Sequence, residues 1–280
     1  MIVSSLLKTI EQTAPPAYAA GWDRSGVQVA SPRQEISSLA VALDPSPKTV
    51  SKALAGGADL LLCHHPLTLQ PRLPDKIDEY HRVLSLCLKA ELWLYAAHTS
   101  LDASPDGPAR WPATAFGLTE VQVLEPAGED RGREYGFGFV GTLPDTSSPE
   151  TFRERVAQVF GRHEWIEAGP EPIRVVRVAC CPGSGGSMIG LARRAGADVF
   201  LTGDVKYHQA MEADMWVVDL GHHAVEEHMM RVWSEHLAGS LSARGVGVFF
   251  IPSSDPLRFV GREALAGSTG TTPISTEVED

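Results

Sequence analysis

A short apolar run, Leu60 to Cys63, ends directly in His64, His65 and Pro66. A run of this kind, closed by a proline that cannot donate a ladder hydrogen bond, predicts a buried strand that leads into a loop. Open α/β sheets place their ligands at the carboxyl ends of their strands, and imidazole is a common metal ligand. The segment therefore predicts a metal site, with a pair of partly exposed loop histidines as the alternative.

Strand and helix patterns alternate along the first hundred residues, which predicts a βαβαβ unit and a parallel sheet. The strands are expected at 36–43, 60–63 and 92–97, and the helices at 47–55 and 77–88. An edge strand or hairpin at 135–143 follows, and then the alternation resumes. Its helices are expected at 151–160, 187–195 and 225–237, and its strands at 174–180, 199–202, 216–219 and 246–251.

Two α/β lobes with mostly parallel sheets are the simplest architecture for this pattern. We expect residues 1–103 to form the first lobe together with a C-terminal strand within 244–262, and residues 104–243 to form the second. Residues 263–280 are rich in Gly, Ser and Thr and end in an acidic cluster, which predicts a disordered tail.

The composition is that of a globular protein, with 43% apolar and 21% charged residues in a chain of 280. No apolar stretch is long enough to cross a bilayer, and residues 1–10 lack a signal-peptide pattern. The four cysteines lie in apolar runs without disulfide or zinc spacing, which favours reduced thiols and a cytoplasmic location. A net charge of −11 argues against binding along a nucleic acid, although it leaves a small anionic ligand open.

Two further strand ends carry metal-binding side chains. His98 and Asp102 follow the strand expected at 92–97, and His222 and Glu226 follow the one at 216–219. Residues four apart share one face of a helix, with Cβ atoms roughly 6 Å apart, so His222 and Glu226 have chelating geometry. Leaving His98 aside, the three strand ends together offer three imidazoles (His64, His65 and His222) and two carboxylates (Asp102 and Glu226). That set exceeds one tetrahedral site and suits two metals about 3.5 to 4 Å apart.

Five segments together resemble the ordered sequence blocks of the NIF-three-like dinuclear-metal family, whose members are often named GTP cyclohydrolase 1 type 2 homologues. They read GWDRSGVQV (21–29), CHHPL (63–67), AHTSLDA (97–103), TGDVKYH (202–208) and GHHAVEE (221–227). The resemblance implies metal ligands at the five positions His64, His65, Asp102, His222 and Glu226, with Glu226 as a bridge. It also implies two interlinked α/β lobes, a NIF-three-like fold and a ring-shaped homo-oligomer, commonly a hexamer.

The remaining candidates each have two interpretations. His98 is expected to act beside the metals as a proton shuttle, or else to be a structural histidine. Asp204, Lys206 and His208 either form a rim over the metals or begin a helix. Trp22, Asp23 and Arg24 are candidates for the substrate pocket, and Arg24 stands where the family usually has Asn. The glycine-rich loop 182–187 offers backbone amides to an anion, but it lacks a P-loop lysine.

These observations predict a metal-dependent hydrolase that holds two divalent ions, with Zn, Fe(II) and Mn(II) all suited to mixed imidazole and carboxylate ligands. The resemblance implies hydrolytic opening of the guanine ring of GTP, hence a small anionic or nucleotide-like ligand. Two alternatives remain open at this point. One is a phosphoesterase-type hydrolase on the same metals, and the other is a non-catalytic metal-binding scaffold or partner-binding ring.

Overall fold

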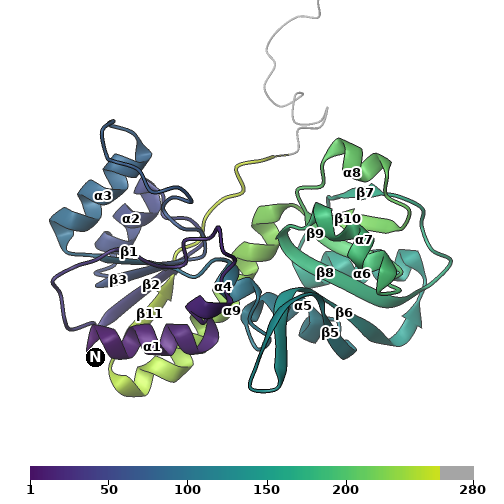
Figure 1. The fold of residues 1–280 in the computed structure, drawn as a ribbon, viewed down its shortest axis with the longest axis horizontal. Helices are drawn as coiled ribbons and strands as arrows, with labels where there is room; N and C mark the ends of the chain where they lie inside the picture. Colours follow the sequence, from purple (N-terminus) through teal and green to yellow (C-terminus); the bar gives the residue numbers. More distant parts are fainter. Residues whose placement is uncertain (259–280) are drawn as a thin grey trace, which may run out of the picture.

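The computed structural model describes residues 1–258 and contains two β-sheets, each flanked by helices (Figure 1). The tail predicted at 263–280, and the end of the C-terminal segment 244–262, lie outside the described residues. Within residues 1–258, no helix has both the length and the apolar character needed to cross a membrane.

The first sheet has the strand order β1-β4-β3-β2-β11. Strands β2 (Ser38–Ala42), β3 (Leu60–Cys63), β4 (Trp93–Ala96) and β11 (Gly247–Phe250) are parallel, and β1 (Gly26–Val29) pairs antiparallel with β4. Helices α2 (Pro47–Ala55) and α3 (Glu79–Ala90) pack on one face, and α1 (Val3–Thr13) packs on the other. The predicted parallel βαβαβ unit is confirmed. Helix α3 begins later than expected because Asp78 caps it, its carboxylate accepting a hydrogen bond from the His81 backbone N–H.

The second sheet has the strand order β5-β6-β8-β9-β10-β7 and is mixed. Strands β8 (Val175–Ser184), β9 (Val199–Gly203) and β10 (Trp216–Asp219) are parallel, whereas β5 (Thr119–Asp130), β6 (Arg133–Ser147) and β7 (Ile166–Ala168) make antiparallel pairs. The expectation of mostly parallel sheets is thus correct for the first sheet and wrong for the second. One reason is the two-residue turn at Arg131 and Gly132, both with positive φ, which joins β5 and β6 as a hairpin and so makes them antiparallel.

The helices of the second sheet lie on its two faces. Helix α6 (Pro149–Phe160) shares one core with β8 to β10, and α7 (Ile189–Arg194) packs on the opposite face. The other helices are short: α4 (Thr99–Asp102) follows β4 of the first sheet, α5 (Trp111–Ala115) precedes β5, and α8 (Tyr207–Met211) lies between β9 and β10. Single 3-10 turns occur at Pro16–Tyr18, Pro108–Arg110, Gly186–Met188 and Ser242–Arg244.

Helix α9 (His222–Leu241) links the two sheets (Figure 1). Its buried apolar residues, among them Met229 and Trp233, belong to one core that includes side chains from both sheets. The chain then returns to the first sheet, where β11 pairs with β2. The helix begins three residues before the expected 225–237. Because of this earlier start, His222 and Glu226 occupy the amino-terminal turns of the helix that faces both sheets.

Candidate metal centre

Five polar residues predicted from separate strand ends meet at the junction of the two sheets. His64 and His65 follow β3, and Asp102 ends α4 just after β4. His222 and Glu226 come from the start of α9. The carboxyl ends of β3 and β4 lie at one edge because these strands are parallel, and α9 enters from the second sheet. We call these five residues the histidine–carboxylate cluster.

Glu226 lies at the centre of this cluster and is almost completely buried. Its Oε2 atom lies 2.8 Å from Nε2 of His222 and 3.2 Å from Nε2 of His65. Its Oε1 atom lies 3.5 Å from Nε2 of His64, which in turn lies 3.7 Å from Oδ1 of Asp102. The two carboxylate oxygens of Glu226 therefore face different histidines.

The cluster and its neighbour His98 contain two groups of side chains close enough to hold a metal ion. One group comprises His64, His65 and His98, and the other comprises His65, His222 and Glu226. The ligand atoms within each group lie within 4.8 Å of one another. His65 belongs to both groups, so the two candidate positions are adjacent. His98, predicted as a neighbour of the metals, is close enough to be a ligand itself.

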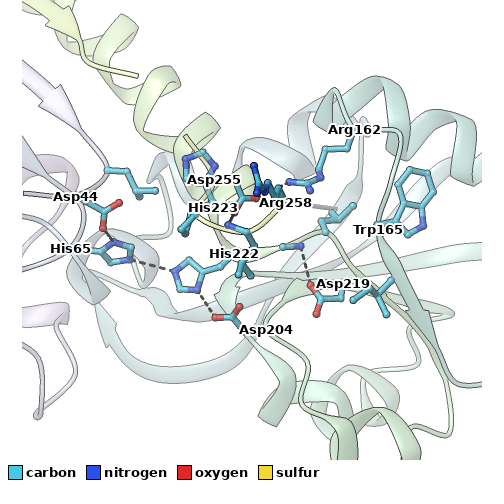
Figure 2. A pocket seen from close by; sticks show the side chains of 16 residues that line it. Asp44, His65, Arg162, Trp165, Asp204, Asp219, His222, His223, Asp255 and Arg258 are labelled. Atoms are coloured by element: carbon cyan, nitrogen blue, oxygen red, sulfur yellow. Dashed lines mark hydrogen bonds and ion pairs between the residues drawn. The ribbon is translucent and has the colours of Figure 1, made fainter. Parts of the chain in front are cut away.

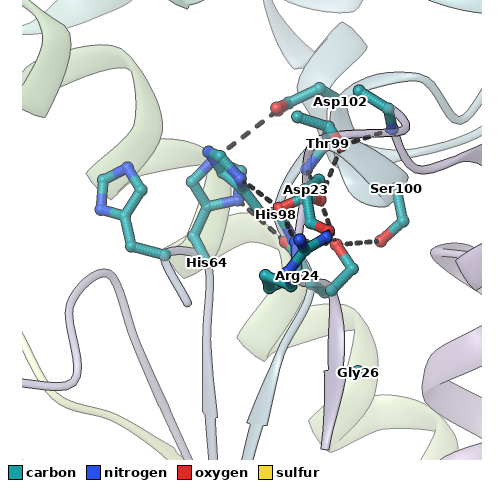
Figure 3. Close-up of polar contacts among 12 residues, drawn as sticks. Asp23, Arg24, Gly26, His64, His98, Thr99, Ser100 and Asp102 are labelled. Carbon is teal, nitrogen blue, oxygen red and sulfur yellow. Dashed lines mark hydrogen bonds and ion pairs between the residues drawn. The ribbon is translucent and has the colours of Figure 1, made fainter. Parts of the chain in front are cut away.

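All four histidines are oriented in the same way, through a hydrogen bond at Nδ1. Each acceptor is a peptide carbonyl or an ionised carboxylate oxygen, and neither of these can donate a hydrogen bond. Each Nδ1 therefore carries the proton, and each Nε2 is left to bind a cation. Such outer partners fix the ring orientation of metal-binding histidines. The bonds are His64 to Ala97 O at 2.9 Å, His65 to Asp44 Oδ1 at 2.7 Å, His98 to Asp23 Oδ1 at 2.8 Å and His222 to Asp204 Oδ2 at 2.7 Å (Figures 2 and 3).

The inner atoms of the cluster fit a metal ion by their chemistry. Nε2 of His64 and Oδ1 of Asp102 are buried and have no hydrogen-bond partner within residues 1–258, and the buried Oε2 of Glu226 faces the ring nitrogens of His65 and His222. Nε2 of His65 lies 3.4 Å from Nε2 of His222. Buried polar atoms without partners are costly, and two facing lone pairs beside carboxylates repel one another. A cation or bound protons must therefore balance this arrangement.

The pKa shifts of the cluster arise from the close contacts between its buried imidazoles and carboxylates. Burial alone would lower the pKa of His65, but hydrogen bonds to Asp44 and Glu226 raise it to about 10. The hydrogen bond and charge of Glu226 raise the pKa of His222 to about 9. Burial would raise the pKa of Glu226, yet the surrounding imidazoles hold it well below its usual value. The metal-free cluster consequently binds protons where it would otherwise bind cations.

Gly183 of the predicted glycine-rich loop lies at the end of strand β8 and touches the cluster directly, a role that the sequence did not indicate. Gly183 has a φ of +67°, and a Cβ atom there would lie 2.3 Å from Oε1 of Glu226. The backbone therefore needs glycine for its conformation and for its close approach to the carboxylate. The amide of Gly185 donates to Thr202 Oγ1 at 3.0 Å, so this amide supports the loop itself.

Asp23 and Trp22, two of the candidates for the substrate pocket, contact His98 beside the cluster. The Asp23 carboxylate is buried and accepts hydrogen bonds from His98 and from the backbone and hydroxyl of Thr99 (Figure 3). Trp22 is 58% exposed and packs edge-on against His98, with 5.7 Å between ring centroids. Arg24 is exposed and donates to the Asp23 backbone carbonyl.

The three candidates that follow β9, Asp204, Lys206 and His208, have different surroundings in the structure. Asp204 contacts His222 and lines a cavity next to the cluster. Lys206 and His208 are exposed at the start of α8, where the Lys206 amide donates to Gln209. Neither of them lines that cavity, so their position favours the helix-start interpretation.

Asp44 is a contact residue that sequence reasoning missed. It follows the end of β2 by two residues, so it obeys the same strand-end rule that identified the histidines. A single carboxylate between Leu43 and Pro45 gives a weak signal by itself. Extending the rule to every strand of the first sheet would have found it.

The sequence matches a known protein family over almost the whole part of the chain that the structure describes. The family described as Duf34/NIF3 (NGG1p interacting factor 3) matches residues 1–256. The chain belongs to the DUF34/NIF3 family. The predicted resemblance to NIF-three-like proteins is thereby confirmed.

Individual relatives of this DUF34/NIF3 chain agree with the assignment. A GTP cyclohydrolase 1 type 2 homolog of Streptomyces coelicolor is 33% identical over 234 residues, covering 80% of this chain and 81% of the relative. The solved structure of reduced HcgD from Methanocaldococcus jannaschii is 27% identical, with a TM-score of 0.78, covering 89% of this chain and 97% of that one. A Bacillus cereus protein related to NIF3, at 21% identity, matches with a TM-score of 0.82 over 93% of this chain and 99% of that one, which shows the common fold.

Proposed function

We propose that this protein is a hydrolase that uses two divalent metal ions held by the histidine–carboxylate cluster. The central supporting observation is the position of Glu226, whose two oxygens face different histidines. A carboxylate so placed is suited to bridge two cations. His65 belongs to both candidate groups, which supports two adjacent positions.

The donor set defines which residues would hold each ion. His64 and Asp102 belong to one side of the cluster and His222 to the other, with Glu226 between them. Mixed imidazole and carboxylate ligands suit Zn, Fe(II) and Mn(II). When bound, two such ions supply water activation near neutral pH and stabilisation of negative charge.

His98 is the residue we propose to move protons. Its Nδ1 is held by Asp23 at 2.8 Å, and its ring lies 5.2 Å from that of His64 and 5.6 Å from that of His65. The fixed Nδ1 leaves Nε2 to accept or donate a proton next to the cluster. The buried Asp23 carboxylate holds the ring in this orientation.

The names of the curated relatives support one specific reaction, the hydrolytic opening of the guanine ring of GTP. We also propose, from the family resemblance, that the chain assembles into a ring-shaped homo-oligomer, commonly a hexamer. All four cysteines are buried free thiols, which supports a reducing compartment such as the cytoplasm.

Metal analysis tests the proposal first. Protein purified without chelator and reloaded anaerobically with Zn, Mn or Fe(II) should contain close to two ions per chain. One ion or fewer would contradict the dinuclear site. The loaded protein is then assayed with GTP, other nucleotides and simple phosphoesters, with Glu226→Gln as the inactive variant and Glu235→Gln, exposed on the same helix, as its matched control. Two bound ions without turnover of any of these compounds would favour the non-catalytic scaffold.

A further inference from the structure

A cavity of about 840 Å³ lies apart from the histidine–carboxylate cluster. Helix α5 and the 3-10 turn before it form one side, the second half of α9 forms another, and the start of β5 forms a third (Figure 1). No described residue lines both this cavity and the one next to the cluster. The volume is within the range of small-molecule sites, so the cavity is large enough to be a second binding site.

The cavity contains a positive charge that the protein does not neutralise. Of the described residues that line it, Arg110 is the only arginine or lysine and Asp106 is the only carboxylate. Asp106 is held by two nitrogens of Arg133, and Arg110 makes no ion pair within residues 1–258. Nη2 of Arg110 is buried without a hydrogen-bond partner among the same residues. Since a guanidinium stays charged and an unpaired buried charge is costly, Arg110 is suited to receive an anion.

Trp111 places a second unpaired donor in the same wall. The residue is 9% exposed, and its indole Nε1 atom is buried with no hydrogen-bond partner in the described part of the chain. Its ring is held by two neighbours, with 4.1 Å between the ring centroids of Trp111 and His228 and 5.0 Å between those of Trp111 and Phe160. Buried indole N–H groups usually have a partner. Two consecutive residues of this wall therefore carry donor atoms that the described residues leave unpaired.

Most of the remaining wall is apolar. Leu118, Val121 and Val232 line it, together with alanine and proline residues. The lining thus offers one unbalanced positive charge beside a hydrocarbon surface. Such a site suits a monoanion with an apolar body. A phosphate group carries nearly two negative charges at neutral pH, and Arg110 alone would leave part of that charge unpaired.

We propose that this cavity binds a small apolar carboxylate, such as a short alkanoate or an aromatic acid. The carboxylate pairs with the Arg110 guanidinium, and the hydrocarbon part packs against Leu118, Val121 and Val232. The site is additional to the metal centre and shares no residue with it. The inference therefore stands or falls independently of the proposed hydrolase function.

Isothermal titration calorimetry of the metal-loaded protein with benzoate and hexanoate tests the site. Each acid is compared with its uncharged amide, benzamide or hexanamide, and with inorganic phosphate. At least one acid should bind about tenfold or more tightly than its amide, because hydrogen bonds to a charged group are the stronger ones. It should also bind more tightly than phosphate. Absence of binding by both acids, or tighter binding of phosphate, would overturn the proposal.

Variants of the wall distinguish this site from direct binding of the acid to the metal ions. Arg110→Gln should weaken acid binding about 10- to 100-fold and leave amide binding unchanged. Leu118→Ala should weaken the acid and the amide alike. Arg194→Gln, exposed on α7 and outside the cavity, is the matched control and should bind both like the unaltered protein.

Metal content and melting temperature are measured for each variant. Arg110→Gln should keep its metal and should melt no lower than the unaltered protein, because it removes a buried charge that has no partner. A loss of acid binding in that variant then reports on the site and not on unfolding. Unchanged acid binding in Arg110→Gln would place the acid elsewhere and overturn the proposal.

Discussion

Replacing Gly183 by alanine should damage the metal centre through a single added methyl group. The new Cβ would lie 2.3 Å from Oε1 of Glu226, and ordinary van der Waals contact begins near 3.4 Å. The carboxylate or the loop must therefore move by about 1 Å to relieve the overlap. Ligand distances in metal sites tolerate only about 0.2 Å, so Glu226 could not keep the position that the proposed pair of ions requires.

Two energetic effects contribute to this substitution. An alanine with a φ of +67° costs about 1 to 2 kcal/mol in the left-handed region. Overpacking against a buried group adds about 1 to 3 kcal/mol. Gly57 separates the two effects, because it has a φ of +73° but no atom lies within 4 Å of the point that a Cβ atom would occupy. Gly57→Ala should therefore show the backbone cost alone.

The assay combines chemical denaturation with chelator competition for both variants. We expect Gly183→Ala to be less stable than Gly57→Ala in the metal-free form and to bind metal about 10- to 100-fold more weakly, the range seen when the surroundings of a ligand are disturbed. Gly57→Ala should bind metal like the unaltered protein. Equal metal affinities for the two variants would refute the argument that Gly183 positions Glu226.

Three further predictions concern the cluster itself. The pKa of His65 is raised to about 10 and that of His222 to about 9, so both imidazoles carry an additional proton at neutral pH when no metal is bound. Metal binding must release these protons. Metal affinity should accordingly rise from pH 6 to 9, by roughly tenfold per pH unit for each proton released, and a flat profile in chelator competition would contradict this. Glu226→Gln should lose or disorder both ions, whereas His65→Ala should weaken mainly one; elemental analysis that finds both ions firmly bound in Glu226→Gln would exclude the bridge. His98→Ala should keep both ions and lower turnover by roughly 100-fold in the substrate assay, while loss of an ion would make His98 a ligand instead.

Local sequence patterns were sufficient to predict which side chains gather at the candidate site. The apolar run before His64 and His65 marks a buried strand, and the four-residue spacing of His222 and Glu226 places both on one helix face. These are properties of neighbouring residues, so periodicity and residue type reveal them. The rule that parallel strands end at one edge then brings His64, His65 and Asp102 together.

Only the tertiary structure could assign the outer contacts of the site. Asp44 and Asp204 reach their histidines across 21 and 18 residues of chain, and Gly183 meets Glu226 from a different sheet. Such pairs depend on where separate segments pack, and no periodic pattern encodes that. The mixed second sheet has in part a similar origin, because β6 pairs with β8 and β7 pairs with β10 across long stretches of chain. The sequence thus determined which atoms could bind metal, while the packing of α9 between the two sheets decided how they are oriented.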